Sequence, residues 1–161
     1  MDFDQRLQKA ITRGEQTKSA EVRKRADRAL SEEEFKNLHS QYRLELSEHI
    51  EDCLRKLADH FPGFRYQTVV SEDGWGAKVT RDDLNLGSKR STGNLFSRFE
   101  LLIRPFSSTH IVELVAKGTI HNKEVINHAN FQFLSEADLD SLKAMIDQRV
   151  LEYAELFATK S

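Results

Sequence analysis

The chain has 161 residues, of which 39% are hydrophobic and 31% charged, and its formal net charge is −2. This composition is typical of one globular domain of ordinary size, and it excludes a wholly disordered or collagen-like chain. The near balance of charge provides no overall field that would attract nucleic acid or an anionic membrane.

The cysteine content and the first residues bear on compartment and cofactors. The one cysteine, Cys53, cannot form an internal disulfide, and no set of cysteines and histidines has the spacing of a zinc site. The opening residues lack the apolar central stretch of a secretory signal, and no apolar run approaches the ~20 residues of a membrane span. We therefore expect a cytoplasmic protein with no membrane attachment, no metal and no cofactor.

Residues 1–30 favour helix by propensity, but their apolar pattern is thin. Phe3, Leu7 and Ile11 are four residues apart, and Gly14 then interrupts the pattern. We predict a basic helical arm, a short helix followed by a basic one, ahead of a single α+β domain over residues 31–161. No aromatic residue stands beside its cations to stack a base, so a solvated face or a partner-binding arm is the favoured interpretation. These cations are Arg23, Lys24, Arg25 and Arg28.

A long amphipathic helix is predicted over residues 32–60. Ser31 can cap it, with Glu34 three residues on as in a capping box, and Pro62 disfavours helix in the residue before it. Cys53 lies on the apolar stripe, so we interpret it as a small buried residue rather than a nucleophile. The stripe recurs at steps of three and four and comprises Phe35, Leu38, Tyr42, Leu46, Ile50, Cys53, Leu54 and Leu57.

From Phe64 the apolar pattern changes to a period of two. It predicts strands near 64–70 and 75–83, joined at the turn signal Asp73-Gly74. The side chains expected to share the inward face are Tyr66, Thr68, Val70, Trp75, Ala77 and Val79.

The segment from Asp82 to Asn94 is polar and rich in Gly, Ser, Asn and Thr, which predicts a long loop. Backbone amides, hydroxyls and two cations are the ingredients of an anion site, although strand-like sequence follows where a Walker loop would open a helix. We favour a solvated loop. The alternative is an anion-binding loop at Ser88, Lys89, Arg90, Ser91 and Thr92.

Three more strands are predicted near 96–104, 109–120 and 124–133. A turn over residues 105–108 would set Phe99 opposite Leu114, and a turn at residues 122–123 would set Leu114 opposite Phe131. This register places every large apolar pair on one face. The expected inward residues are Phe99, Leu101, Ile103, Val112, Leu114, Ala116, Ile120, Val125, Ala129, Phe131 and Phe133.

The same register sets Glu100 opposite Glu113 on the polar face of the sheet. Like charges directly opposite each other repel, and a buried carboxylate pair can hold a general acid near neutral pH. We favour two solvated glutamates balanced by nearby cations. The expected ligand or partner face comprises Arg98, Lys117, Asn130 and Gln132, and the candidate catalytic residues are Glu100, Glu113 and His128.

A second amphipathic helix is predicted over residues 136–158, with Ser135 as its cap and Asp138 at the third position. The predicted fold is therefore α+β: a five-stranded antiparallel meander sheet with two long helices packed on one face, plus the N-terminal helical arm. One helical layer leaves the other face of the sheet exposed.

Function is expected from the surfaces that this fold leaves exposed. We favour a binding or protein-interaction module that engages a protein partner or itself through the free sheet face, the loop or the arm. The alternative is a small enzyme or small-molecule-binding domain that uses Glu100, Glu113, Lys117, His128 and Asn130. The charge balance argues against a third hypothesis, nucleic-acid binding. No two histidines are four apart, so we interpret all six as surface or boundary residues.

Overall fold

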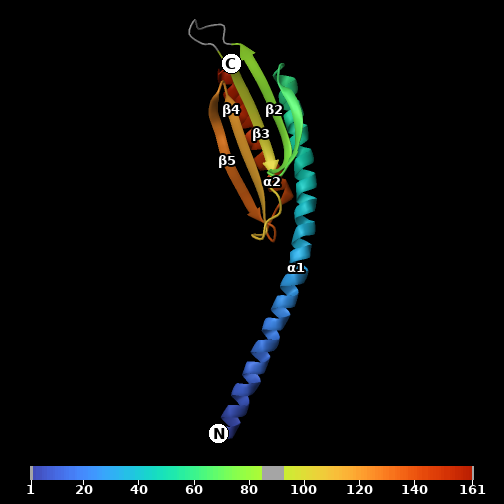
Figure 1. Cartoon of the computed structure of the whole chain (residues 1–161), viewed down its shortest axis with the longest axis vertical. Coiled ribbons are helices and arrows are strands. Elements are labelled where there is room, and N and C mark those ends of the chain that lie inside the picture. Colours follow the sequence, from blue (N-terminus) through green and yellow to red (C-terminus); the bar gives the residue numbers. More distant parts are fainter. Residues whose placement is uncertain (1, 85–92, 161) are drawn as a thin grey trace. The chain divides into compact units, whose positions relative to one another are not determined.

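The computed structural model describes residues 2–84 and 93–160. Over these residues the elements are α1 (Phe3–His60), β1 (Arg65–Ser71), β2 (Gly74–Leu84), β3 (Asn94–Ile103), β4 (Ile111–Ile120), β5 (Lys123–Phe133) and α2 (Leu139–Lys160). The strands form one antiparallel sheet in the order β1-β2-β3-β4-β5 (Figure 1). The α+β class and the five-stranded antiparallel meander are therefore confirmed.

The first helix departs from its prediction. α1 is continuous through Gly14 and Ser31, so the predicted break and the predicted helix start are both wrong. Glycine inside a helix costs only about 0.5–1 kcal/mol, less than the backbone hydrogen bonds that a break would remove. A capping box also needs a non-helical residue at its start, and the residues before Ser31 favour helix.

The chain divides into two units, Met1–Asn37 and Leu38–Ser161. The division into an arm over residues 1–30 and a domain over 31–161 stays a prediction. Over the part of the chain that the structure describes, neither helix has an apolar stretch able to cross a bilayer.

Both helices of the second unit pack on the inner face of the sheet. From α1, the Arg43 guanidinium lies 4.4 Å from the centre of the Trp75 ring on β2. From α2, the Tyr153 ring stacks on Phe99 of β3 at 4.5 Å between centroids. Gly118 of β4 makes this packing possible, because an added Cβ would lie 3.0 Å from the Tyr153 ring. The apolar stripes of the two helices are thus confirmed as the core, with Leu46, Ile50, Leu54, Leu142, Ile146, Tyr153 and Phe157 all buried.

The first hairpin confirms that the predicted inward residues share one face, but Thr68 and Val70 are exposed on it rather than buried. Tyr66 pairs with Val79, Thr68 with Ala77 and Val70 with Trp75. The two strands join at a two-residue turn, because Ser71 pairs with Gly74.

The β3–β4 register differs from the prediction by four residues. Phe99 lies opposite Gly118 rather than Leu114, which instead pairs with Ile103. The connection runs from residue 104 to residue 110, longer than the predicted four-residue turn, and His110 has a φ of 55°. An even shift keeps each side chain on its face, so Phe99, Ile103 and Leu114 remain in the core.

The β4–β5 register differs by one residue, which inverts the faces of β5. The turn residues are His121 and Asn122, with φ of 49° and 70°, rather than residues 122–123, and a bulge follows at Gly118/Thr119. A one-residue shift moves every side chain of a strand to the other face. Phe131 and Phe133, predicted inward, are therefore 52% and 51% exposed.

The same inversion corrects two smaller predictions. Ala129, predicted inward, is exposed, while Ile126, which is absent from the predicted inward residues, is buried opposite Gly118.

The start of α2 and the bounds of the long loop also differ from their predictions. Asp138 rather than Ser135 caps α2, because its Oδ1 accepts a hydrogen bond from the Asp140 amide at 3.3 Å. At the ends of the predicted loop, residues 82–84 belong to β2 and Asn94 to β3, while residues 85–92 lie outside the described residues.

Candidate functional site

The outer face of the sheet does not hold the expected pair of glutamates. Glu100 lies between Lys78 of β2 and Lys117 of β4, and its Oε2 accepts a hydrogen bond from Arg98 Nη2 at 2.6 Å. Glu113 lies opposite Phe131. The predicted juxtaposition of Glu100 and Glu113 is wrong because it depended on the incorrect β3–β4 register.

The remaining candidates divide between the two faces of the sheet. Arg98 and Lys117 lie on the outer face with Glu100. Asn130 and Gln132 alternate onto the inner side of β5, opposite Leu114 and Val112.

Asn130 and Gln132 both form hydrogen bonds with side chains of α2. Arg149 Nη2 donates to Asn130 Oδ1 at 2.9 Å, and Gln132 Nε2 donates to Ser141 Oγ at 3.1 Å. His128, opposite Ala116, is exposed on the same side of β5. The structure thus brings Arg98, Glu100 and Lys117 together and separates them from His128, Asn130 and Gln132. The anion-loop candidates, residues 88–92, lie outside the described residues.

An apolar surface occupies the other part of the outer face. Leu102 of β3 pairs with Val115 of β4, which pairs with Ala129 of β5. Phe131 and Phe133 follow on β5, and their rings meet edge to face at 5.6 Å between centroids. We call Val115, Ala129, Phe131 and Phe133 the outer apolar patch. Large exposed apolar residues gathered on one surface mark interaction sites more often than single ones do.

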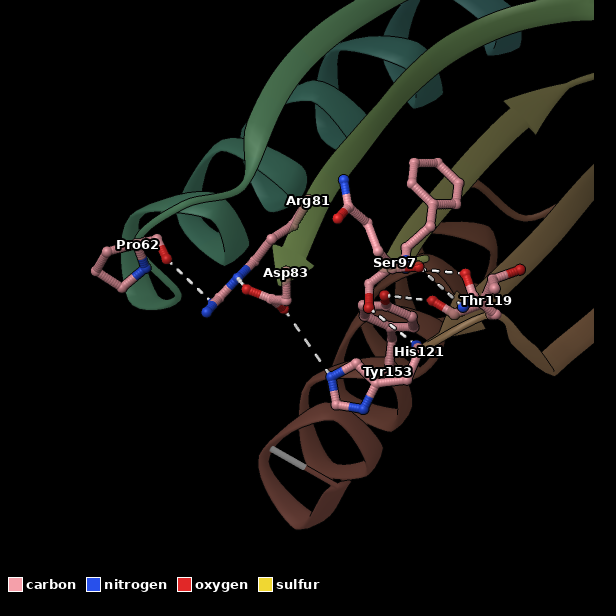
Figure 2. Close-up of polar contacts among 10 residues, drawn as sticks. Pro62, Arg81, Asp83, Ser97, Thr119, His121 and Tyr153 are labelled. Atoms are coloured by element: carbon pink, nitrogen blue, oxygen red, sulfur yellow. Dashed lines mark hydrogen bonds and ion pairs between the residues drawn. The ribbon is translucent and has the colours of Figure 1, made fainter. Parts of the chain in front are cut away.

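A serine, a histidine and an aspartate converge at the end of the sheet where β2 stops and β4 turns into β5 (Figure 2). They do not form a nucleophilic triad. Ser97 is fully buried, and its Oγ accepts from the His121 main-chain amide at 3.1 Å rather than from the imidazole. His121 Nε2 lies 4.0 Å from Asp83 Oδ2.

The contacts of this region are structural. Arg81 Nε donates to Asp83 Oδ1 at 2.9 Å and Arg81 Nη1 to the Pro62 carbonyl at 3.1 Å. Tyr153 donates to the Thr119 carbonyl at 2.8 Å, as Figure 2 shows. The Tyr153 bond joins β4 to α2, and the His121–Asp83 ion pair joins the β4–β5 turn to β2. Ser97, the serine of this region, is buried and not accessible for attack.

A second cluster lies between α1 and α2. His49 and Cys53 are one helical turn apart on α1, and Asp147 faces them from α2. His49 Nε2 lies 2.7 Å from Asp147 Oδ1, and Cys53 Sγ lies 3.4 Å from that oxygen and 3.6 Å from the imidazole nitrogen. One histidine nitrogen therefore approaches both partners, unlike in a catalytic triad, where each ring nitrogen serves one partner.

The environment of Cys53 keeps its thiol protonated. Burial, followed by the hydrogen bond to Asp147 and the charge of that carboxylate, raises the pKa of Cys53 to about 11. Because the thiolate is the nucleophilic form, Cys53 in this state is a poor nucleophile. The side chain is only half-buried, however, whereas the sequence predicted a buried residue.

An open groove of about 500 Å³ begins at this cluster. Cys53 and Asp147 line one end, and the rest of its wall is mainly apolar, with Leu57, Phe61 and Leu151. The groove is large enough for a small organic molecule.

Comparison with protein-family models, with curated proteins and with solved structures found no match to this chain. Its function is therefore argued from its own surfaces. The cluster of His49, Cys53 and Asp147 was not predicted, because the expected mark of a helical metal site was a pair of histidines four residues apart. The four-residue step from His49 to Cys53 on one helix was the available signal, whereas Asp147 is distant in the chain.

Proposed function

We propose that this protein is an interaction module that self-associates through the outer apolar patch. The observation that carries this proposal is the exposure of two adjacent phenylalanines, 52% for Phe131 and 51% for Phe133, on the edge strand of the sheet. Aromatic side chains are enriched at the energetic centres of protein interfaces. Edge strands are also the part of a sheet that most readily pairs with another chain.

A second copy of this chain is the partner that fits best. The patch is bordered by charges of both signs, with Arg104 Nε 3.6 Å from Glu113 Oε1. The outer face beside it likewise alternates Lys78, Glu100 and Lys117 across neighbouring strands. A twofold axis sets one patch against an identical one, so a surface that carries both signs can match cation to anion with its own copy.

The test compares two double variants of the full chain by sedimentation equilibrium. Phe131→Ser with Phe133→Ser removes the aromatic part of the patch. Val70→Ser with Leu84→Ser is the matched control, because these residues are 74% and 70% exposed but lie on β1 and β2. We expect a dimer for the wild type and the control over roughly 1–100 μM, and a monomer for the phenylalanine variant.

Two results would contradict the proposal. A wild-type chain that stays monomeric over this range would exclude self-association. A phenylalanine variant that dimerises as well as the wild type would place the interface elsewhere, in the N-terminal arm first of all.

The alternative function, an enzyme or small-molecule-binding domain on the polar sheet face, has less support. Its proposed residues point to opposite sides of the sheet, with Glu100 and Lys117 on the outer face and Asn130 on the inner side of β5.

A further inference from the structure

The side chains of His49, Cys53 and Asp147 offer a nitrogen, a sulfur and an oxygen, all within 4.8 Å of one another. Two helices position them: α1 supplies the first two from successive turns, and α2 supplies the third. Residues four apart on a helix lie on one face, so the imidazole and the thiol both point toward α2. The cluster is thus assembled by the packing of the domain core rather than by a loop.

The spacing of these atoms fits tetrahedral coordination. With zinc–ligand distances of about 2.3 Å to sulfur and about 2.0–2.1 Å to nitrogen or oxygen, tetrahedral ligand pairs lie about 3.5 Å apart when one is sulfur. The two pairs that include Cys53 Sγ are 3.6 and 3.4 Å apart. Only the His49 to Asp147 pair, at 2.7 Å, would have to open, by roughly 0.6 Å.

We propose that His49, Cys53 and Asp147 form a binding site for Zn²⁺, with three protein ligands and a fourth position open toward the groove beside Phe61. Imidazole, thiolate and carboxylate are the ligand types that zinc takes in proteins, and three protein ligands with one open position is the arrangement of exchangeable rather than closed structural sites. The inference is independent of the outer apolar patch, which lies on the other side of the sheet.

Solvent access and the nearby charges are compatible with a bound Zn²⁺ ion. Side-chain exposures of 27% for His49 and 51% for Asp147 leave an entry path from solvent. The nearby charges of Asp52 and Lys56, which act on Cys53 in opposite directions, offset each other. On binding, the Cys53 thiol proton leaves to solvent and the sulfur binds as thiolate. The His49 ring changes tautomer, so that Nδ1 carries its proton and Nε2 is free to bind the metal. The hydrogen bond between His49 and Asp147 is thereby replaced by two metal–ligand bonds.

Cobalt(II) is the probe of choice, because it adopts zinc geometries and reports them by colour. Full-length protein titrated with Co²⁺ is expected to bind one ion, with a thiolate-to-cobalt charge-transfer band and the intense visible bands of a tetrahedral site. Zn²⁺ should then displace Co²⁺ and raise the temperature of unfolding, because an ion that binds only the folded state stabilises it.

Variants test two of the three ligands. Cys53→Ser should abolish the charge-transfer band, and Asp147→Asn, at an exposed position that tolerates change, should weaken Zn²⁺ affinity by at least about tenfold. His60→Gln is the matched control, because His60 lines the same groove but its Nδ1 bonds to the Lys56 carbonyl at 2.9 Å. Its affinity should stay within about twofold of the wild type.

Added imidazole should shift the visible bands, because a new donor enters the open fourth position. Unchanged bands would contradict that position. Octahedral Co²⁺ spectra without a thiolate band, or a Cys53→Ser variant that is folded by circular dichroism and binds Zn²⁺ as well as the wild type, would overturn the site itself.

Discussion

At the scale of single residues, burial on this sheet follows the alternation of the strands. Leu114 is 1% exposed beneath the helices, whereas its neighbour Val115 faces the other way in the outer apolar patch. Polar residues are less easily placed from the sequence. His39 was interpreted as a surface or boundary histidine, yet it is 3% exposed, and that interpretation is wrong. Its imidazole Nε2–H donates to the Arg104 carbonyl at 3.1 Å, a bond that only the tertiary fold supplies.

The burial of His39 predicts a loss of stability in mild acid. Burial, opposed by the Arg104 hydrogen bond and assisted by the nearby Arg43 charge, lowers the pKa of His39 in the folded protein. The unfolded chain therefore takes up a proton at higher pH than the folded one, so the free energy of unfolding falls as pH decreases below about 6.5. Urea unfolding at about pH 7.5 and about pH 5.5 measures this loss.

The matched variant for this measurement is His39→Gln, whose amide can still donate to Arg104 but does not titrate. The other five histidines are present in both proteins, because the chain has six. We expect a smaller loss of stability in acid for the variant. Equal losses would show that His39 does not carry the effect.

At the scale of elements, the turn between β4 and β5 decides which face of β5 is buried. Asn122 holds this turn with φ of 70°, and its side chain bonds across to β3: Oδ1 accepts from the Phe96 amide at 2.9 Å, and Nδ2 donates to the Asn94 carbonyl at 3.1 Å. Asparagine adopts this left-handed backbone conformation more readily than any residue except glycine. Asn122 thus supports this register in two ways, through its backbone conformation and through its side-chain bonds.

Substitution of Asn122 separates these two roles. Asn122→Ala loses both side-chain bonds and strains the backbone, and it should lower the free energy of unfolding by about 2–4 kcal/mol. Asn122→Gly loses the bonds but accepts the positive φ, and it should cost about 1–2 kcal/mol less than alanine. Chemical denaturation checks both values. If the two variants were equally stable, backbone conformation would contribute nothing at this turn.

At the scale of the whole molecule, α1 extends through both units, but its apolar residues differ widely in how far they are buried. Phe3, Leu7, Ile11 and Val22 are 75%, 46%, 47% and 59% exposed, whereas Leu46, further along the same helix, is fully buried. The burial of apolar area is the main favourable term in folding, so the exposed residues contribute little to it.

Removal of the arm tests this inference. A chain that starts near Ala29 should fold, with an unfolding temperature within a few degrees of the full chain and a smaller helical signal in circular dichroism. An unfolded product would show that the arm belongs to the folding unit. The oligomeric state of the truncated chain also tells whether the arm contributes to association in addition to the outer apolar patch.

Local patterns in the sequence determined the elements and most of the core. Periods of two and of three to four residues depend only on backbone geometry, so they predicted five strands, the amphipathic part of α1 and most of α2. They also predicted the inward faces of β1 to β4, because errors of an even number of residues preserve them. The continuity of α1 through Gly14 was missed because a single glycine costs too little to end a helix.

Tertiary structure alone decided the pairing of strands and the meeting of distant side chains. The register of β5 depends on the Asn122 turn, the bulge at Gly118 and contacts to β3, so Phe131 and Phe133 face outward although their spacing suits a core. Asp147 reaches His49 and Cys53 only because α2 packs beside α1, across 94 residues of chain from Cys53. Such a contact leaves no periodic signal, since it arises from how two finished helices pack rather than from the order of residues in either one.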